Sequence, residues 1–117
     1  MPELACCLQR IPGNGRYWLR HARIDTAFLT EGMLAYGPDG MALADLRIEE
    51  GRIRAVLPAG EAPCCAPGLE LRGGIVRPAD PEGWIGPGCP ADLIVTFPEG
   101  RRLDLRAGCP MPDGRLE

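Results

Sequence analysis

Ala44-Asp45-Leu46-Arg47-Ile48-Glu49-Glu50-Gly51-Arg52-Ile53-Arg54-Ala55-Val56 is the stretch that decides the fold. Successive side chains of a strand point to opposite faces, so a half-buried strand alternates apolar and polar residues. Before Glu50-Gly51, the apolar residues Leu46 and Ile48 alternate with Arg47 and Glu49. After it, Ile53, Ala55 and Leu57 alternate with Arg52, Arg54 and Val56. The stretch predicts a β-hairpin with one buried face.

The residues around this hairpin predict further short strands separated by turns. Gly37-Pro38-Asp39-Gly40 is a turn signal, because Pro sets the first turn torsion and Gly accepts positive φ. We expect short strands at 34–36 and 41–43, a loop over 59–68, and strand alternation again over 69–76. Another strand is expected from Tyr17 onward, preceded by a loosely ordered N-terminal arm over residues 1–15.

The C-terminal part of the chain shows the same short elements. Residues 77–90 are rich in proline and glycine, so no regular element is expected to run through them. The apolar run at 93–95 favours a central strand covered on both faces, and alternation at 103–106 predicts one more strand before a Pro/Gly-rich tail. No amphipathic helix pattern is present. Six to eight short strands predict an all-β fold, a small β-sandwich.

Composition narrows the class of protein. The 117 residues fit one domain, and a net charge of -3 with arginines spread singly along the chain argues against a nucleic-acid partner. No apolar run reaches the roughly 20 residues that span a bilayer, and no secretory leader pattern opens the chain. We expect no membrane association and a cytoplasmic protein, whose six cysteines then stay reduced.

Two further phrases follow the hairpin in a characteristic order. Gly74-Ile75-Val76-Arg77-Pro78 comes first, and Trp84-Ile85-Gly86-Pro87-Gly88-Cys89-Pro90-Ala91-Asp92-Leu93-Ile94-Val95 follows it. With the preceding strands, this series resembles the non-catalytic part of the amidohydrolase superfamily, and most closely its cytosine-deaminase-like, metal-dependent members. In that family the phrase matching 74–78 leads directly into the catalytic barrel, whose first strand supplies two metal ligands. Here Ala79-Asp80-Pro81-Glu82-Gly83 follows instead.

The resemblance implies an accessory composite β-sandwich without its catalytic barrel. Residues 16–117 would form this single domain, with N-terminal strands over 16–78, a bridge over 79–90 in place of the barrel, and C-terminal strands over 91–117. The family uses zinc or iron, but its ligands lie in the missing barrel. We therefore expect no cofactor, no metal ligand and no catalytic residue in this chain.

His21 and Asp92 are the residues that invite a catalytic interpretation. His21 is the only histidine, whereas a catalytic zinc site usually takes three protein ligands, so we expect a surface or turn residue. Asp92 matches the aspartate of the family's returning Pro-Ala-Asp phrase, and we expect its carboxylate to hydrogen-bond backbone groups. The sequence contains no serine, which excludes a serine nucleophile.

The cysteines do not follow the spacing of a structural zinc site. Cys6-Cys7 and Cys64-Cys65 are adjacent pairs, while Cys89 and Cys109 stand alone, and zinc ligands are typically separated by about two to four residues. Free thiols are the expectation, with adventitious binding of soft metals by the adjacent pairs. A cysteine-based metal or redox module stays open as an alternative function.

The sequence therefore predicts a non-catalytic accessory domain with a structural or interaction role, to which any hydrolase label would pass by homology alone. A second hypothesis is one part of a metal-dependent hydrolase of carbon-nitrogen bonds other than peptide bonds, completed by a separate barrel protein. The expected partners are a second copy of the chain or such a barrel, bound through an apolar docking face that the missing barrel leaves exposed.

Overall fold

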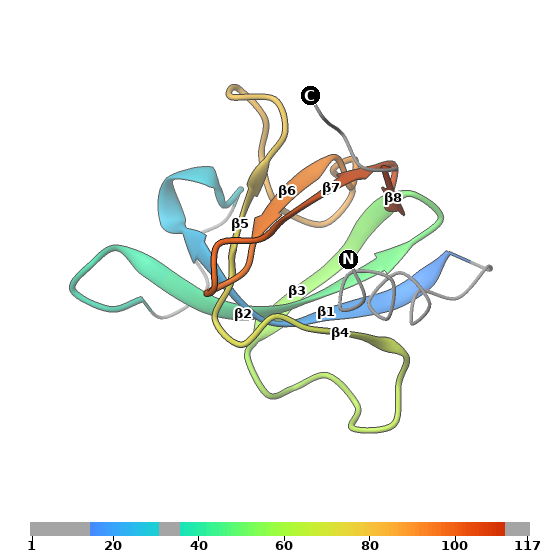
Figure 1. Cartoon of the computed structure of the whole chain (residues 1–117), viewed down its shortest axis with the longest axis horizontal. Helices are drawn as coiled ribbons and strands as arrows, with labels where there is room; N and C mark the ends of the chain where they lie inside the picture. The colour runs from blue at the N-terminus through green and yellow to red at the C-terminus, as the bar shows by residue number, and fades with distance from the viewer. Residues whose placement is uncertain (1–14, 31–35, 112–117) are drawn as a thin grey trace.

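The computed structural model describes residues 15–30 and 36–111 (Figure 1). The elements are β1 (Arg16–Asp25), the 3-10 helix η1 (Thr26–Phe28), β2 (Met41–Glu49), β3 (Arg52–Pro58), β4 (Gly68–Glu70), β5 (Ile75–Pro78), β6 (Leu93–Thr96), β7 (Arg102–Arg106) and β8 (Cys109–Pro110). The prediction of an all-β fold is confirmed. Within the described ranges no helix is long and apolar enough to cross a membrane. The arm predicted at 1–15 lies almost wholly outside the described residues, as does most of the strand predicted at 34–36.

β2 and β3 form the antiparallel hairpin that residues 44–56 predict. Glu50 and Gly51 have positive φ angles of 54° and 80°, as in the type I′ turns that match the twist of paired strands. Ile53 is buried as the alternation requires. A register shift opposite Arg47 and Ile48 makes Arg54 an extra residue in β3, and the residues after it are only partly buried. The predicted alternation is therefore wrong beyond Arg54, because a β-bulge interrupts it.

A second irregularity bends β1, which pairs antiparallel with β2 and has a register shift between Leu19 and Ala22. His21 lies in this bulge with a φ of 56°. The fully buried carboxylate of Asp45 on β2 accepts a hydrogen bond from the His21 amide at 2.9 Å through Oδ1. Its Oδ2 accepts from the amides of Gly60 and Ala62, each at 2.9 Å. One buried carboxylate thus holds both the bulge and the start of the loop that follows β3.

β4 and β5 run parallel to β1 as two pieces of one interrupted strand. β4 pairs with Trp18 to Arg20, and β5 pairs with β1 at Arg23 and Ile75. The interruption is a tight turn over 71–74, which is hydrogen-bonded to the bulge of β1. The Leu71 amide donates to Arg20 O at 2.9 Å, and the Gly73 amide donates to His21 O at 2.7 Å. The bulge in β1 and the break between β4 and β5 therefore lie side by side.

β5 to β8 form an antiparallel series at the C-terminal end of the chain. Pro78 pairs with Leu93, so the loop over residues 79–92 leaves the sheet and returns to it at neighbouring positions. β5 extends to Pro78, two residues into the stretch 77–90 for which no regular element was expected. β6 is buried along Leu93–Val95 and has neighbours on both sides, which confirms the prediction of a central strand.

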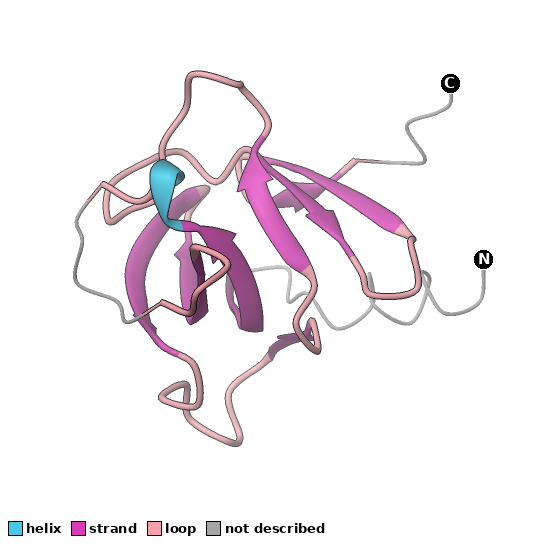
Figure 2. Cartoon of the chain, turned by 90° about the vertical axis from the view of Figure 1, so that its left-hand side faces the viewer, coloured by secondary structure: helices cyan, strands magenta, loops and turns pink. Residues whose placement is uncertain are grey.

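The eight strands belong to one sheet, and its two ends meet. Figure 2 shows the sheet folded into two layers, with β1 to β3 in one and β5 to β7 in the other. Between the ends, the Ile53 amide donates to Cys89 O at 2.9 Å, and the Ala91 amide donates to Gly51 O, also at 2.9 Å. The Gly108 amide in turn donates to Ala91 O at 2.9 Å. The described strands thus form one continuous sheet that closes through the segment 88–91, and the composite sandwich stays a prediction.

A single hydrophobic core fills the space between the layers. Its members are Tyr17, Leu19, Ala22, Ile24, Ala42, Ala44, Leu46, Ile48, Ile53, Leu69, Leu71, Val76, Ile85, Ala91, Leu93, Val95, Phe97, Leu103 and Leu105. Residues from β1 and from β7 contribute, and the Tyr17 hydroxyl of β1 donates to Gly108 O, just before β8, at 2.5 Å. Burial raises the pKa of this phenol well above its ordinary value, with a smaller contribution from Cys109. The N- and C-terminal strands therefore fold as one unit.

Candidate functional site

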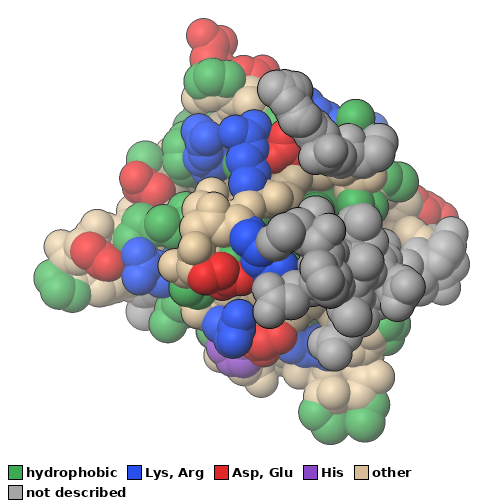
Figure 3. All heavy atoms as spheres, viewed as in Figure 1, with side chains coloured by type: hydrophobic (Ala, Val, Ile, Leu, Met, Phe, Trp, Pro, Cys, Tyr) green, Lys and Arg blue, Asp and Glu red, His purple; other side chains and the backbone are tan. Residues whose placement is uncertain are grey.

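Charged side chains of both signs are interspersed over the face shown in Figure 3. Arginines pair with carboxylates at the surface, as in Arg102 with Asp104 at 2.7 Å and Arg72 with Glu99 at 3.7 Å. Exposed pairs of this kind contribute little to stability, because solvent screens them. On the described part of this face, the mixture differs from the basic stripe typical of nucleic-acid binding.

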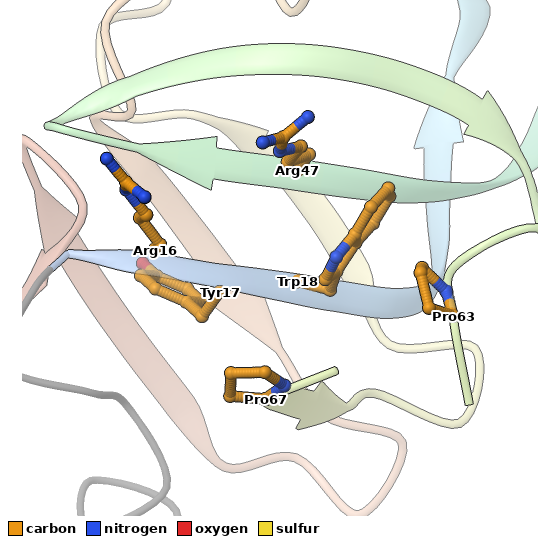
Figure 4. A pocket seen from close by; sticks show the side chains of 6 residues that line it. All are labelled: Arg16, Tyr17, Trp18, Arg47, Pro63 and Pro67. Atoms are coloured by element: carbon orange, nitrogen blue, oxygen red, sulfur yellow. The ribbon is translucent and has the colours of Figure 1, made fainter. Parts of the chain in front are cut away.

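The candidate site is a shallow, open hollow of about 470 Å³ on the outside of the sheet. It is lined by Arg16, Tyr17 and Trp18 of β1, Arg47 of β2, and Pro63 and Pro67 of the loop before β4. Figure 4 shows Trp18 between Arg47 and Pro63, with Arg16 farther along β1. The lining combines two guanidinium groups with the flat apolar surfaces of an indole and two prolines.

Backbone pairing brings these side chains together. Trp18 lies directly opposite Arg47 in the register of β1 and β2. On the other side of β1, the Trp18 amide donates to Pro67 O at 3.0 Å. Gly68 makes this approach possible, because a Cβ there would overlap the carbonyl oxygen of Trp18. The hollow is therefore formed by two strands and by a loop that glycine allows to lie against them.

Arginines and glutamates of the described strands form a group of ion pairs beside the hollow. Glu49 is surrounded by Arg16 at 3.0 Å, Arg54 at 3.5 Å and Arg47 at 3.6 Å, while Arg54 also approaches Glu50 at 3.4 Å. Glu49 is largely shielded, with 18% of its side chain exposed, whereas the three arginines are 43% to 62% exposed. The guanidinium groups and apolar rings of the hollow are suited to contact with an acidic group next to an apolar surface, and none of its six lining residues carries a carboxylate, a thiol or an imidazole.

His21 is exposed in the β1 bulge, as the sequence predicts. Its Nδ1 lies 2.9 Å from both carboxylate oxygens of Glu70 on β4, and Glu70 also accepts a hydrogen bond from the Arg72 amide at 2.9 Å. Through its backbone, His21 binds Asp45 and Gly73. These contacts tie the bulge to the break between β4 and β5, which is a structural arrangement.

Asp92 bonds to the backbone, as predicted, although its partner is distant in sequence. Its Oδ1 accepts a hydrogen bond from the Ala107 amide at 2.7 Å, and its carbonyl accepts one from the Ala79 amide at 2.9 Å. Ala107 has a φ of 51° in the turn between β7 and β8. The carboxylate therefore stabilises a strained turn next to the point where β6 begins.

The described cysteines are free thiols in separate places. Cys64 and Cys65 are exposed on the loop after β3, Cys89 packs partly buried against the core, and Cys109 is exposed in β8. Cys6 and Cys7 lie outside the described residues. Among the residues that the structure describes, no group of three or more His, Cys, Asp or Glu is placed to hold a metal ion.

Leu43 and Ile75 form a small exposed apolar area on neighbouring strands of the sheet. Leu43 and Ile75 are 52% and 38% exposed, and both pair in register with Arg23, from opposite sides of β1. They therefore flank one arginine on neighbouring strands. Their use as a binding face stays a prediction.

Sequence reasoning missed the hollow and the role of Asp45. The hollow could have been suspected from Trp18, which follows Arg16 in the predicted first strand, and from Pro63 and Pro67 in the predicted loop over 59–68. For Asp45, the signal was a carboxylate in the interior of a strand, a position where aspartate is depleted. No protein-family model matches this chain, and no curated protein matches its sequence.

Proposed function

We propose that the chain is a non-catalytic β-domain with a structural or interaction role, comparable to the accessory domain of amidohydrolase-like proteins. The observation that carries this proposal is the placement of the loop over 79–92. Pro78 and Leu93 are paired neighbours, and the Ala79 amide donates to Asp92 O at 2.9 Å. An inserted domain usually enters and leaves its host at nearby points. The adjacent ends of this loop support the proposal that it replaces an inserted domain.

The contacts of His21 and Asp92 support a structural role. His21 joins the β1 bulge to Glu70 and to the turn after β4, and Asp92 stabilises the turn before β8. The hollow around Trp18 supports an interaction role, since its arginines and apolar rings suit an acidic segment of a partner. A reducing, cytoplasmic location is part of the proposal and agrees with the free thiols of Cys64, Cys65, Cys89 and Cys109.

Domain insertion tests the proposal directly. The loop projects from the molecule beyond β5 in Figure 1, and its tip is a turn in which the Gly83 amide donates to Asp80 O at 2.8 Å. A small, independently folding domain with adjacent termini is inserted between Pro81 and Glu82, both exposed. We expect the β-domain to keep its circular dichroism spectrum and to unfold within a few degrees of the parent.

The matched control places the same domain between Glu50 and Gly51. Gly51 packs against Ala107 and accepts the hydrogen bond from the Ala91 amide, so insertion there breaks the closure of the sheet and should prevent folding. If insertion after Pro81 disrupts folding as severely as the control, the loop is not an insertion point and the proposal loses its support.

A second measurement tests the non-catalytic part of the proposal. The purified chain, supplied with zinc or ferrous iron, is assayed for hydrolysis of cyclic amides and nucleobases. We expect no turnover above that of the metal ions alone. Turnover that disappears in the His21→Ala variant would overturn the proposal.

A further inference from the structure

Cys64 and Cys65 occupy the tip of the loop between β3 and β4. The Ala66 amide donates to Pro63 O at 3.1 Å, so the two cysteines are the central residues of a β-turn. Both are exposed, and their Sγ atoms lie 3.6 Å apart. Two thiols are therefore presented together to solvent at one point of the surface.

Arg20 holds this turn at both ends. Its Nη2 donates to Pro63 O at 2.9 Å and to Ala66 O at 2.5 Å, the residues immediately before and after the cysteine pair. The same loop is held farther back by Asp45, through the amides of Gly60 and Ala62. Because the turn is already ordered, a ligand that bridges the two thiols loses little conformational entropy on binding.

The separation of the two sulfur atoms favours a bridging atom. A disulfide bond is about 2.0 Å long and usually joins Cα atoms about 4.4–6.8 Å apart, whereas adjacent residues in a trans peptide have Cα atoms about 3.8 Å apart. Two sulfur bonds of about 2.3 Å that meet at a tetrahedral angle place the sulfur atoms about 3.8 Å apart. The observed 3.6 Å is close to that value. Soft thiolate ligands select soft, thiophilic acceptors.

We propose that Cys64 and Cys65 form a dithiol site that chelates a single thiophilic atom, of which trivalent arsenic carrying one organic group is the model ligand. The reaction with phenylarsine oxide is a condensation: each thiol gives up its proton, two arsenic–sulfur bonds form, the arsenic–oxygen bond is lost, and one water molecule leaves. No electron transfer is involved. This site is separate from the proposed structural role and does not depend on it.

The test uses the full chain carrying Cys6→Ser and Cys7→Ser, which removes the other adjacent pair. The protein is treated with phenylarsine oxide, washed with excess monothiol, and analysed by intact-protein mass spectrometry. We expect one phenylarsenic group per chain to survive the monothiol wash and to be released by a small dithiol, because a chelate needs two displacements. Adding Cys109→Ser, which removes another exposed thiol, should leave the adduct unchanged.

Cys64→Ser and Cys65→Ser, each added separately to this parent, should abolish the retained adduct. Both positions are exposed on a loop, and circular dichroism verifies that each variant is folded. The proposal is wrong if the parent retains no phenylarsenic group after the monothiol wash. It is equally wrong if either folded serine variant retains the group as the parent does.

Discussion

Two loops among the described residues, 59–67 after β3 and 79–92 after β5, are held in place by different means. The middle of the first loop is held by two side chains from neighbouring strands, Asp45 and Arg20, which bond to its amides and carbonyls, while backbone hydrogen bonds to the sheet are made at its ends, Ala59 and Pro67. The second is held largely by backbone hydrogen bonds. Its Ile85 amide donates to Phe28 O at 2.8 Å, and its Gly88 amide donates to Ile53 O at 2.7 Å.

This difference determines how each loop responds to substitution. Backbone hydrogen bonds persist when a side chain is replaced, and the 79–92 loop is also anchored by Ile85, which is fully buried. The 59–67 loop depends on a carboxylate and a guanidinium group, so one substitution removes several contacts together. The first loop should therefore be sensitive to single polar substitutions, and the second should tolerate them.

The largest difference in stability is expected when one aspartate that bonds to each loop is replaced by alanine. Asp45→Ala leaves the amides of His21, Gly60 and Ala62 without their acceptor, and loss of charge-assisted, buried hydrogen bonds should lower the free energy of unfolding by roughly 3 kcal/mol or more. Asp80→Ala removes an exposed contact to the Glu82 amide, and should change stability by no more than about 0.5 kcal/mol. Urea denaturation of both variants measures the difference.

Asp45→Asn refines this comparison. The amide keeps one oxygen acceptor but presents an NH₂ group to at least one of the three donors, so its loss of stability should be smaller than that of Asp45→Ala and still clear. Similar stabilities for Asp45→Ala and Asp80→Ala would show that the buried carboxylate does not hold the first loop.

Tyr17 allows a second test, because its hydroxyl joins the N-terminal strands to Gly108 near the C-terminal end of the sheet. Tyr17→Phe removes the donor to a buried carbonyl and should lower stability at neutral pH by about 1.5 kcal/mol. Tyr36→Phe is the matched control, since Tyr36 is 67% exposed. Urea denaturation at pH 7 compares the two variants with the parent.

The same variant predicts a pH dependence. Burial raises the pKa of Tyr17 in the folded state, so above about pH 10 the unfolded chain releases this proton while the folded chain keeps it. Stability should therefore be intact below pH 10 and should fall as the pH rises above it, by up to about 1.4 kcal/mol per pH unit. Tyr17→Phe should lack this contribution. If the free energy of unfolding changes with pH by the same slope in the parent and in Tyr17→Phe between about pH 9 and 11, this prediction is contradicted.

Local patterns predicted the elements of the fold better than their arrangement. The hairpin over 44–56 was predictable because its alternation and its Glu50-Gly51 turn are contained within a few residues. The parallel pairing of β1 with β4 and β5 was not, since it joins residues about 50 positions apart and leaves no local signal. The predicted alternation failed beyond Arg54, where a bulge shifts the register.

The candidate site shows the same limit. His21 was correctly expected at the surface, although its position in the β1 bulge was not predicted. Asp92 was correctly expected to bond to the backbone, but Ala107 could not be identified as its partner. The hollow combines Trp18 with Pro63 and Pro67, which only the β1–β4 pairing brings together. Contacts between side chains that are far apart in the sequence therefore cannot be predicted from the sequence alone.

The two loops can also be compared by replacing one arginine that contacts each of them. Arg20→Met removes contacts to Pro63 O and Ala66 O and should weaken the 59–67 loop locally by about 1 kcal/mol. Arg52→Met removes one exposed contact, to Gly88 O at 3.0 Å, from a loop that backbone hydrogen bonds also hold. Hydrogen exchange measured by mass spectrometry should accelerate over 59–67 in Arg20→Met and change little over 86–91 in Arg52→Met. Equal acceleration of both segments would mean that the first loop does not depend on side chains more than the second does.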